Sequence, residues 1–168
     1  MADVVLVGLP GSGKTTTARA LAARLERPFV DTDDVFFERE NVTVQEYLRG
    51  HDENEFRQRE LGALTWALAL GGVVATGGGI VATAASRRLL SGQLTVWLDS
   101  PDEVLVSRVR DGDRPLLGDD PGARLVELRA RRDALYAEVS RCRVDSSGPL
   151  EGVLEQIVRI VASVRTSP

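Results

Sequence analysis

Cysteine and histidine are almost missing from this chain, and their scarcity excludes two kinds of site. The 168 residues include one cysteine, Cys142, and one histidine, His51. A lone cysteine cannot form an internal disulfide, so we expect the protein to work in a reducing compartment. His51 stands in the polar stretch GHDEN with no cysteine and no second histidine to join it, which excludes the usual zinc arrangements. We interpret it as a solvated loop residue.

Long apolar runs and an excess of basic charge are also lacking. No run reaches the roughly 18 apolar residues that a membrane span needs, and the opening MADVVLVG has neither the basic region nor the cleavage site of a secretory signal. The formal net charge of −4 argues against nonspecific nucleic-acid binding. With 43% hydrophobic and 27% charged residues, we expect one globular, cytoplasmic domain over residues 1–168, with no membrane and no nucleic-acid partner.

Lysine is the scarcest basic residue, and the one present stands in the most informative stretch. Of the 21 basic residues only Lys14 is a lysine. It belongs to Gly8–Thr15, GLPGSGKT, which fits the pattern G-x-x-x-x-G-K-T of a phosphate-binding loop. An apolar run precedes the loop and a helical pattern follows it, as this pattern requires. The alternative is a tight turn that merely contains glycines, but the complete pattern seldom arises by chance in a chain of this length.

The residue types in this loop suit the phosphate chain of a nucleotide. Gly11 and Gly13 let backbone N–H groups approach phosphate oxygens with no Cβ in the way. The helix that follows adds unpaired N–H groups and the positive end of its dipole. We expect Lys14 to reach the β- and γ-phosphates, and the Thr15 hydroxyl to ligate Mg²⁺.

Strand and helix patterns alternate along the chain, which predicts an α/β fold with a parallel sheet covered on both faces. The expected strands are residues 3–8, 28–31, 73–75, 95–98 and 142–144. The expected helices are residues 13–25, one or two short helices within 35–50, then 54–70, 82–90, one that starts near 101, 124–140 and 150–164. Residues 111–122 are rich in Gly, Pro and Asp and are expected to form a mobile loop. In such a fold the functional loops gather at the carboxyl ends of the strands.

Two carboxylates follow the second expected strand. Asp31 and Asp33 are two residues apart, so in extended backbone they would point the same way. Beside a phosphate site, one could hold Mg²⁺ through water while the other accepts a hydrogen bond from a substrate hydroxyl. The alternative is a cap on the following helix, from Asp31, Thr32 or Asp33. In a chain with a phosphate-binding loop we favour the functional interpretation.

Two further groups lie in the middle of the chain. Arg57 and Glu60 are three residues apart and share one face of a long expected helix. The bare sequence favours an ordinary surface ion pair over a functional one. The glycines at 77–79 follow the third strand and exceed what a tight turn needs, so we favour contact between bare backbone and a ligand.

The sequence does not decide the roles of several arginines in the second half of the chain. Arg114 lies in the expected mobile loop, where it could close over a transferring phosphoryl group or be a solvated charge, with even odds. Arg129, Arg131 and Arg132 crowd one expected helix. Most of such a run is a solvated face, and periodicity does not say which of the three points inward.

With these residues placed, the sequence resembles the shikimate kinase family over essentially its whole length. The resemblance rests on motifs in order: GLPGSGKTT at 8–16, DTD at 31–33, EFRQRE at 55–60, TGGG at 76–79, RPLL at 114–117 and RRDALY at 131–136. Each motif is weak alone, but their order and spacing are specific. The resemblance implies a three-layer α/β/α P-loop kinase fold with a five-stranded parallel sheet of order 2-3-1-4-5. It also implies transfer of the γ-phosphoryl group of ATP to the 3-hydroxyl of shikimate, with Mg²⁺ as cofactor.

The resemblance further implies roles for individual residues, with a substrate-binding region at about 32–61 and a lid at about 111–122. The implied catalytic residues are Lys14, Asp33 and Arg114. The implied ATP-binding residues are Gly11, Ser12, Gly13, Lys14, Thr15, Thr16, Arg108, Arg110, Arg114 and Pro149. The implied shikimate-binding residues are Asp33, Arg57, Gly78, Gly79 and Arg132. Mg²⁺ is expected at Thr15 and, through water, at Asp31.

Among these, Arg57 and Arg132 would clamp the substrate carboxylate and Glu60 would orient Arg57. Two guanidinium groups around one carboxylate give strong and oriented recognition. Arg108 and Arg110 compete for the place that stacks on adenine. We expect a monomer that binds ATP and shikimate.

Two other functions stay open on the sequence. One is a kinase for another small hydroxy acid, such as gluconate. The pair of Arg57 and Arg132 and the RPLL motif favour shikimate over such a substrate. The other is a nucleotide-dependent regulatory switch. The guanine-binding pattern N-K-x-D is absent, since Lys14 is the only lysine.

Overall fold

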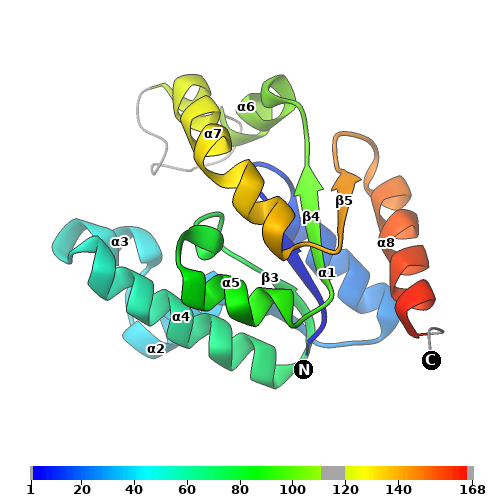
Figure 1. Cartoon of the computed structure of the whole chain (residues 1–168), viewed down its shortest axis with the longest axis horizontal. Coiled ribbons are helices and arrows are strands. Elements are labelled where there is room, and N and C mark those ends of the chain that lie inside the picture. The colour runs from blue at the N-terminus through cyan, green and yellow to red at the C-terminus, as the bar shows by residue number, and fades with distance from the viewer. Residues whose placement is uncertain (1, 111–119, 166–168) are drawn as a thin grey trace.

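The computed structural model describes residues 2–110 and 120–165, and a single parallel sheet forms its centre (Figure 1). The five strands lie in the order β2-β3-β1-β4-β5, and neighbours pair in parallel throughout. Their bounds are β1 Ala2–Val7, β2 Phe29–Asp31, β3 Gly72–Ala75, β4 Thr95–Asp99 and β5 Cys142–Asp145. The predicted parallel sheet and its strand order are confirmed.

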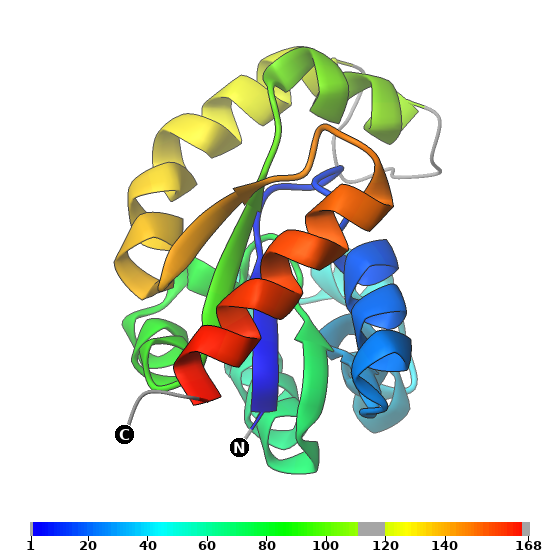
Figure 2. The ribbon, with the colours of Figure 1, turned by 90° about the vertical axis from the view of Figure 1, so that its right-hand side faces the viewer.

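Helices cover both faces of this sheet, which gives the three layers that were predicted. Alternate residues of β1 point to opposite faces, and they belong to two separate cores. Val5 and Val7 pack with the side of α4, α5 and α7, whereas Val4 and Leu6 pack with α1 and α8. Figure 2 shows α8 crossing in front of the sheet with α1 beside it.

The helices occupy nearly all of the segments that the sequence predicts for them. Their bounds are α1 Lys14–Leu25, α2 Thr32–Glu40, α3 Val44–Gly50, α4 Glu53–Leu70, α5 Ala84–Ser91, α6 Asp102–Arg110, α7 Pro121–Val139 and α8 Leu150–Arg165, with a short 3₁₀ helix, η1, at Ile80–Ala82. Among the described residues, no helix combines the length and the apolar character that a membrane crossing requires.

Two boundaries differ from the sequence prediction because of capping side chains. The segment 35–50 contains two helices, and the first starts at Thr32, because the Asp31 carboxylate accepts a hydrogen bond from the Asp33 N–H at 2.9 Å. The segment 82–90 begins one turn earlier as η1, and α5 starts after Thr83, whose hydroxyl accepts from Ser86 N–H at 3.2 Å.

The predicted lid at 111–122 needs a correction at its end. Residues 111–119 lie outside the described part of the chain, and so does Arg114. Residues 121 and 122 are not loop but the first turn of α7. The Asp120 carboxylate accepts a hydrogen bond from Ala123 N–H at 3.0 Å and Pro121 occupies the first helical position, so the helix begins three residues before the predicted start at Arg124.

Candidate active site

The phosphate-binding loop lies between β1 and α1, at the carboxyl end of the central strand. Its glycines are required by space and backbone conformation. A Cβ on Gly8, whose φ is +150°, would lie 2.2 Å from the carbonyl oxygen of Leu98, and one on Gly11, at φ +84°, would lie 2.9 Å from that of Leu105. Only glycine lets the loop run this close to β4 and α6.

Lys14 folds back over this loop and is only 7% exposed. Its amino group donates hydrogen bonds to the carbonyl oxygens of Gly8 at 2.8 Å and Leu9 at 2.9 Å. The ammonium is therefore held inside the loop, where an incoming phosphate chain would meet it.

The two residues predicted to hold Mg²⁺ lie against each other. Thr15 Oγ1 is 2.9 Å from Asp31 Oδ2, while the other oxygen of the Asp31 carboxylate caps α2. The capping alternative is thus confirmed, and the same carboxylate also lies beside Thr15. A hydroxyl and a carboxylate oxygen are hard donors of the kind that Mg²⁺ prefers, so this pair fits the ion. Among the described residues, no cluster of three or more His, Cys, Asp and Glu side chains could hold a metal ion by itself.

Asp33 lies near Asp31 and Lys14, but not for the reason the sequence suggested. The expectation that it points with Asp31 from extended backbone is wrong, because Asp33 lies in the first turn of α2. A Cβ built on Gly77 would lie 3.0 Å from Asp33 Oδ1 and 3.7 Å from Glu60 Oε1. The two carboxyl groups therefore meet at the edge of the glycine turn.

The surroundings of Asp33 change its acidity. Protein atoms crowd its carboxyl group although water reaches the side chain, and this burial is the main reason that the pKa of Asp33 rises to about 6. The neighbouring carboxylates of Asp31 and Glu60 raise the pKa further, and Lys14 opposes them. A carboxyl group with this pKa can exchange a proton near neutral pH.

Arg57 and Glu60 are not the surface pair that the bare sequence favoured. Their side chains are 16% and 11% exposed and are joined by a 2.7 Å bond from Arg57 Nη1 to Glu60 Oε2. The same Nη1 donates to the Gly79 carbonyl oxygen at 3.2 Å. The Arg57 Nε is buried and bonds to no described residue. Burial raises the pKa of Glu60, while the charges of Arg57 and Arg132 lower it.

Gly77–Gly79 form a turn that side chains from three other elements hold. The Gly77 N–H donates to the Thr32 hydroxyl at 3.1 Å, and the Gly78 carbonyl oxygen accepts from the Tyr136 hydroxyl at 2.5 Å. The N–H groups of Gly78 and Gly79 donate to no residue in the described part of the chain. The structure therefore leaves free donors at the two glycines that the sequence predicted to contact a ligand.

Of the three crowded arginines on α7, Arg132 is the one near the glycine turn. Its charge acts on both Glu60 and Tyr136. Arg131 is 68% exposed and pairs with Glu127 on the surface. Arg129 turns toward β4 and α6 instead, as described below.

A pocket of about 340 Å³ adjoins the phosphate-binding loop, and the two arginines that the sequence offered for adenine contact differ in their position relative to it. Arg108 lines it and donates to the carbonyl oxygens of Gly11 at 3.3 Å and Ser146 at 2.8 Å. Arg110 is exposed and is not part of the lining. Pro149 stands between two lining residues, Gly148 and Leu150.

Comparison with known proteins agrees with this geometry. The family model described as shikimate kinase matches residues 10–162. The chain belongs to the shikimate kinase family. It is 41% identical over 162 residues to a shikimate kinase of Dechloromonas aromatica, covering 94% of this chain and 88% of that protein.

Solved structures agree with the family membership. A shikimate kinase from Acinetobacter baumannii in complex with shikimate has a TM-score of 0.90 and 32% identity, covering 98% of this chain and 94% of that one. A gluconokinase from Sinorhizobium meliloti 1021 has a TM-score of 0.68 at 19% identity, covering 97% of this chain and 93% of that one, which is a likeness of fold alone. The family resemblance seen in the sequence is therefore confirmed. The members of the shikimate kinase family are ATP-dependent kinases.

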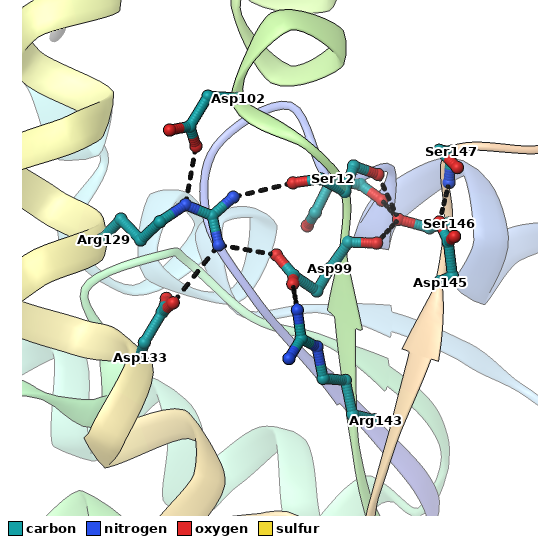
Figure 3. A network of polar contacts seen from close by, with 10 residues as sticks. Ser12, Asp99, Asp102, Arg129, Asp133, Arg143, Asp145, Ser146 and Ser147 are labelled. Carbon is teal, nitrogen blue, oxygen red and sulfur yellow. Dashed lines mark hydrogen bonds and ion pairs between the residues drawn. The ribbon is translucent and has the colours of Figure 1, made fainter.

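A polar network ties the helix α7 of this kinase to its nucleotide side, and the sequence did not reveal it (Figure 3). Arg129 bonds to Asp102 at 2.6 Å, Asp99 at 3.0 Å, Asp133 at 3.2 Å and the Ser100 carbonyl oxygen at 2.7 Å. Asp99, only 6% exposed, also pairs with Arg143.

A serine continues the network to the phosphate-binding loop. The Ser146 hydroxyl lies 2.8 Å from the carbonyl oxygen of Ser12 and 2.9 Å from the Ser100 hydroxyl. An open pocket of about 550 Å³ lies beside the network, but four of its charged lining residues, Asp99, Asp102, Arg129 and Arg143, already form ion pairs with one another.

Proposed function

We propose that this protein transfers the γ-phosphoryl group of ATP to the 3-hydroxyl of shikimate, giving shikimate 3-phosphate and ADP. The observation that carries the proposal is the convergence of Asp33, Glu60 and Arg57 on the glycine turn, beside a phosphate-binding loop that holds Lys14. Phosphoryl transfer depends on positioning and on charge stabilisation rather than on an unusual nucleophile. These residues supply both.

The acceptor side suits a small anion with hydroxyl groups. Arg57 and Arg132 would clamp its carboxylate, because a planar guanidinium matches carboxylate geometry. Glu60 holds Arg57 in place through their 2.7 Å bond. The free N–H groups of Gly78 and Gly79 would donate to the substrate, and Asp33 would accept a hydrogen bond from the reacting hydroxyl.

The donor side suits ATP with Mg²⁺. The N–H groups of Gly11, Ser12 and Gly13, with Thr16, would surround the phosphates, and Lys14 would neutralise the group in transfer. Thr15 would hold Mg²⁺ directly and Asp31 through water, where the ion would neutralise charge on the phosphates. Arg108 and Pro149 would lie on either side of adenine. Arg114 would act from the lid and Arg110 would have at most a peripheral part.

Asp33 is the residue best placed to take the proton of the reacting hydroxyl. Its raised pKa, about 6, makes it a stronger base than an ordinary aspartate. Lys14 lies close enough to oppose that rise, so the base and the phosphate-binding ammonium serve the same reaction centre.

The test is ADP release measured with ATP and Mg²⁺ in the presence of shikimate, gluconate or neither. We expect release that depends on shikimate and is at least a hundredfold slower with gluconate. Equal rates with gluconate would favour the broader hydroxy-acid kinase. Nucleotide binding without any transfer, but with altered binding of a partner protein, would favour the regulatory switch. A cytoplasmic location and a monomeric state remain predictions, the second of which sedimentation measures directly.

A further inference from the structure

The glycine turn can adopt two conformations that differ in what they offer a ligand. Ile80 N–H donates to the Gly77 carbonyl oxygen at 3.2 Å, which closes a four-residue turn. Gly79 has φ −88° and ψ −2°, as expected at the third residue of a type I turn. A type II turn differs by a half rotation of the central peptide and needs a positive φ at that third residue, which glycine allows. The glycine sequence alone therefore does not choose between them.

The turn type decides whether the N–H or the C=O of the central peptide, between Gly78 and Gly79, faces the substrate. The Gly78–Gly79 peptide is trans, since the described chain has no cis peptide bond. Its C=O and N–H therefore point in opposite directions. A flip to type II would exchange the two, so that a hydrogen-bond acceptor would stand where a donor stands now.

The adjacent peptides of the turn are already held. The Gly77 N–H donates to Thr32, and the Gly79 carbonyl oxygen accepts from Arg57 at 3.2 Å and from the Ala82 N–H at 2.9 Å. The central peptide has one bond, the one from Tyr136 to the Gly78 carbonyl oxygen at 2.5 Å. Its N–H, that of Gly79, has no acceptor among the described residues.

Tyr136 is suited to hold this carbonyl firmly. The residue is 0% exposed, and its ring centroid lies 5.8 Å from that of Trp97. Burial raises the pKa of Tyr136, and the charge of Arg132 only partly opposes the rise. Because the ordinary pKa of tyrosine is already about 10, the hydroxyl keeps its proton and remains a donor at neutral pH.

We propose that Tyr136 is a positioning residue: its hydroxyl holds the Gly78–Gly79 peptide in the type I orientation and thereby directs the Gly79 N–H toward the acceptor substrate. This inference rests on the proposed function. It gives the tyrosine of RRDALY a role in the reaction although it touches neither substrate nor nucleotide.

Tyr136→Phe tests the proposal because it removes the hydroxyl and keeps the ring against Trp97. We expect the KM for shikimate to rise about tenfold, the size of one well-placed hydrogen bond. The KM for ATP should change less than twofold, and kcat less than the KM for shikimate. A merely structural bond would lower the melting temperature without this split between substrates.

Thr95→Val is the matched control. The Thr95 hydroxyl is also buried and also donates to a main-chain carbonyl oxygen, that of Leu90, at 2.8 Å. It lies at the start of β4, at the far end of the sheet from the glycine turn. We expect a comparable loss of thermal stability with no change in the KM for shikimate. Equal changes of KM in both variants would overturn the proposal.

An amide spectrum of ¹⁵N-glycine-labelled protein gives a second readout, which observes the Gly79 N–H directly. Saturating shikimate should move the Gly79 amide proton downfield in the wild type, and the movement should be less than half as large in Tyr136→Phe. A Gly79 amide that does not respond in the wild type overturns the proposal. No shikimate-dependent ADP release by the wild type would instead refute the proposed function, whereas normal release with an unchanged KM in Tyr136→Phe refutes only the role of Tyr136.

Discussion

Lys14 is almost fully buried, although lysine is among the residues least often buried in proteins. Its charge is matched by the carbonyl oxygens of Gly8 and Leu9, so burial does not leave it without partners. Asp33 shows the opposite case, because burial of its carboxyl group, together with the neighbouring carboxylates of Asp31 and Glu60, raises its pKa. At the scale of residues, the chemistry of the site depends on such neighbours as much as on residue type.

Replacing Lys14 by methionine should abolish most of the turnover and leave the fold intact. Methionine has a similar length and can occupy the same buried space, but it has no positive charge to stabilise the phosphoryl group. We expect kcat to fall at least a thousandfold, or about 4 kcal/mol of transition-state stabilisation. A circular dichroism spectrum like that of the wild type, with near-normal ADP release, would contradict the role of Lys14.

The pKa of Asp33 predicts how activity depends on pH. Asp33 must be ionised to take the proton of the reacting hydroxyl, so kcat/KM should fall tenfold per pH unit below about pH 6. Asp33→Asn should lose turnover, whereas Asp34→Asn, on the adjacent exposed position, should keep it. A pH profile without this fall would show that Asp33 is not required in its ionised form.

The raised pKa of Asp33 also predicts that the folded state loses stability as the pH rises, whereas activity increases over the same range. Since the pKa of Asp33 is raised from 3.8 to about 6, its folded form favours the proton. The stability that this contributes is fully present below pH 4 and is lost as the pH rises through 6. Asp33→Asn should therefore melt at a higher temperature than the wild type at pH 7.5, with the difference vanishing near pH 4. Equal melting curves at pH 7.5 would refute the shift.

At the scale of elements, α7 is the helix on which most depends. One of its faces carries Arg132 and Tyr136 toward the glycine turn. On the same face, about two turns before Tyr136, Arg129 bonds to β4 and α6 (Figure 3). A helix fixed at two places along its length holds its side chains more precisely than a loop would.

Arg129→Met should destabilise the protein through Asp99. Without Arg129, the nearly buried Asp99 carboxylate keeps, among the residues that the structure describes, only the exposed Arg143 as a charged partner. We expect a loss of about 2–4 kcal/mol of unfolding free energy, close to that of breaking a buried pair. Arg131→Met, which removes only an exposed pair with Glu127, should cost less than about 1 kcal/mol. Urea denaturation measures both, and equal losses would show that the network contributes little.

At the scale of the whole molecule, the parallel sheet brings together loops from distant parts of the chain. The phosphate-binding loop follows β1, Asp33 follows β2, and the glycine turn follows β3. Because all the strands run the same way, their carboxyl ends meet at one edge. The residues proposed for the donor and acceptor sites thus lie at one edge of the sheet, although they come from distant parts of a chain of 168 residues.

Each ligand should stabilise the molecule independently, which can be measured by thermal unfolding. A ligand at one hundred times its Kd adds about 2.7 kcal/mol, which for a domain of this size raises the melting temperature by roughly 5–10 °C. We expect shifts with ADP and with shikimate. Arg57→Met should abolish the shift with shikimate and keep that with ADP. Loss of both shifts would mean that Arg57 supports the fold rather than the acceptor site.

The sequence by itself determined what depends on short stretches of chain. The run from Gly8 to Thr15 specifies a strand, a glycine loop and a helix within a few residues, so the phosphate-binding loop could be predicted. Alternation of apolar strands and amphipathic helices specified the layered parallel sheet, and the order of motifs indicated the family.

Only the tertiary structure decided which side chains meet across the fold. Arg108 and Arg110 are two residues apart on one helix, and their spacing cannot say which of them lines the pocket beside the phosphate-binding loop. The spacing of Arg57 and Glu60 suggested a surface ion pair, whereas both side chains are largely buried in the structure. Tyr136 contacts Gly78 across 58 positions of sequence. Such contacts depend on how whole elements pack, and no local pattern encodes them.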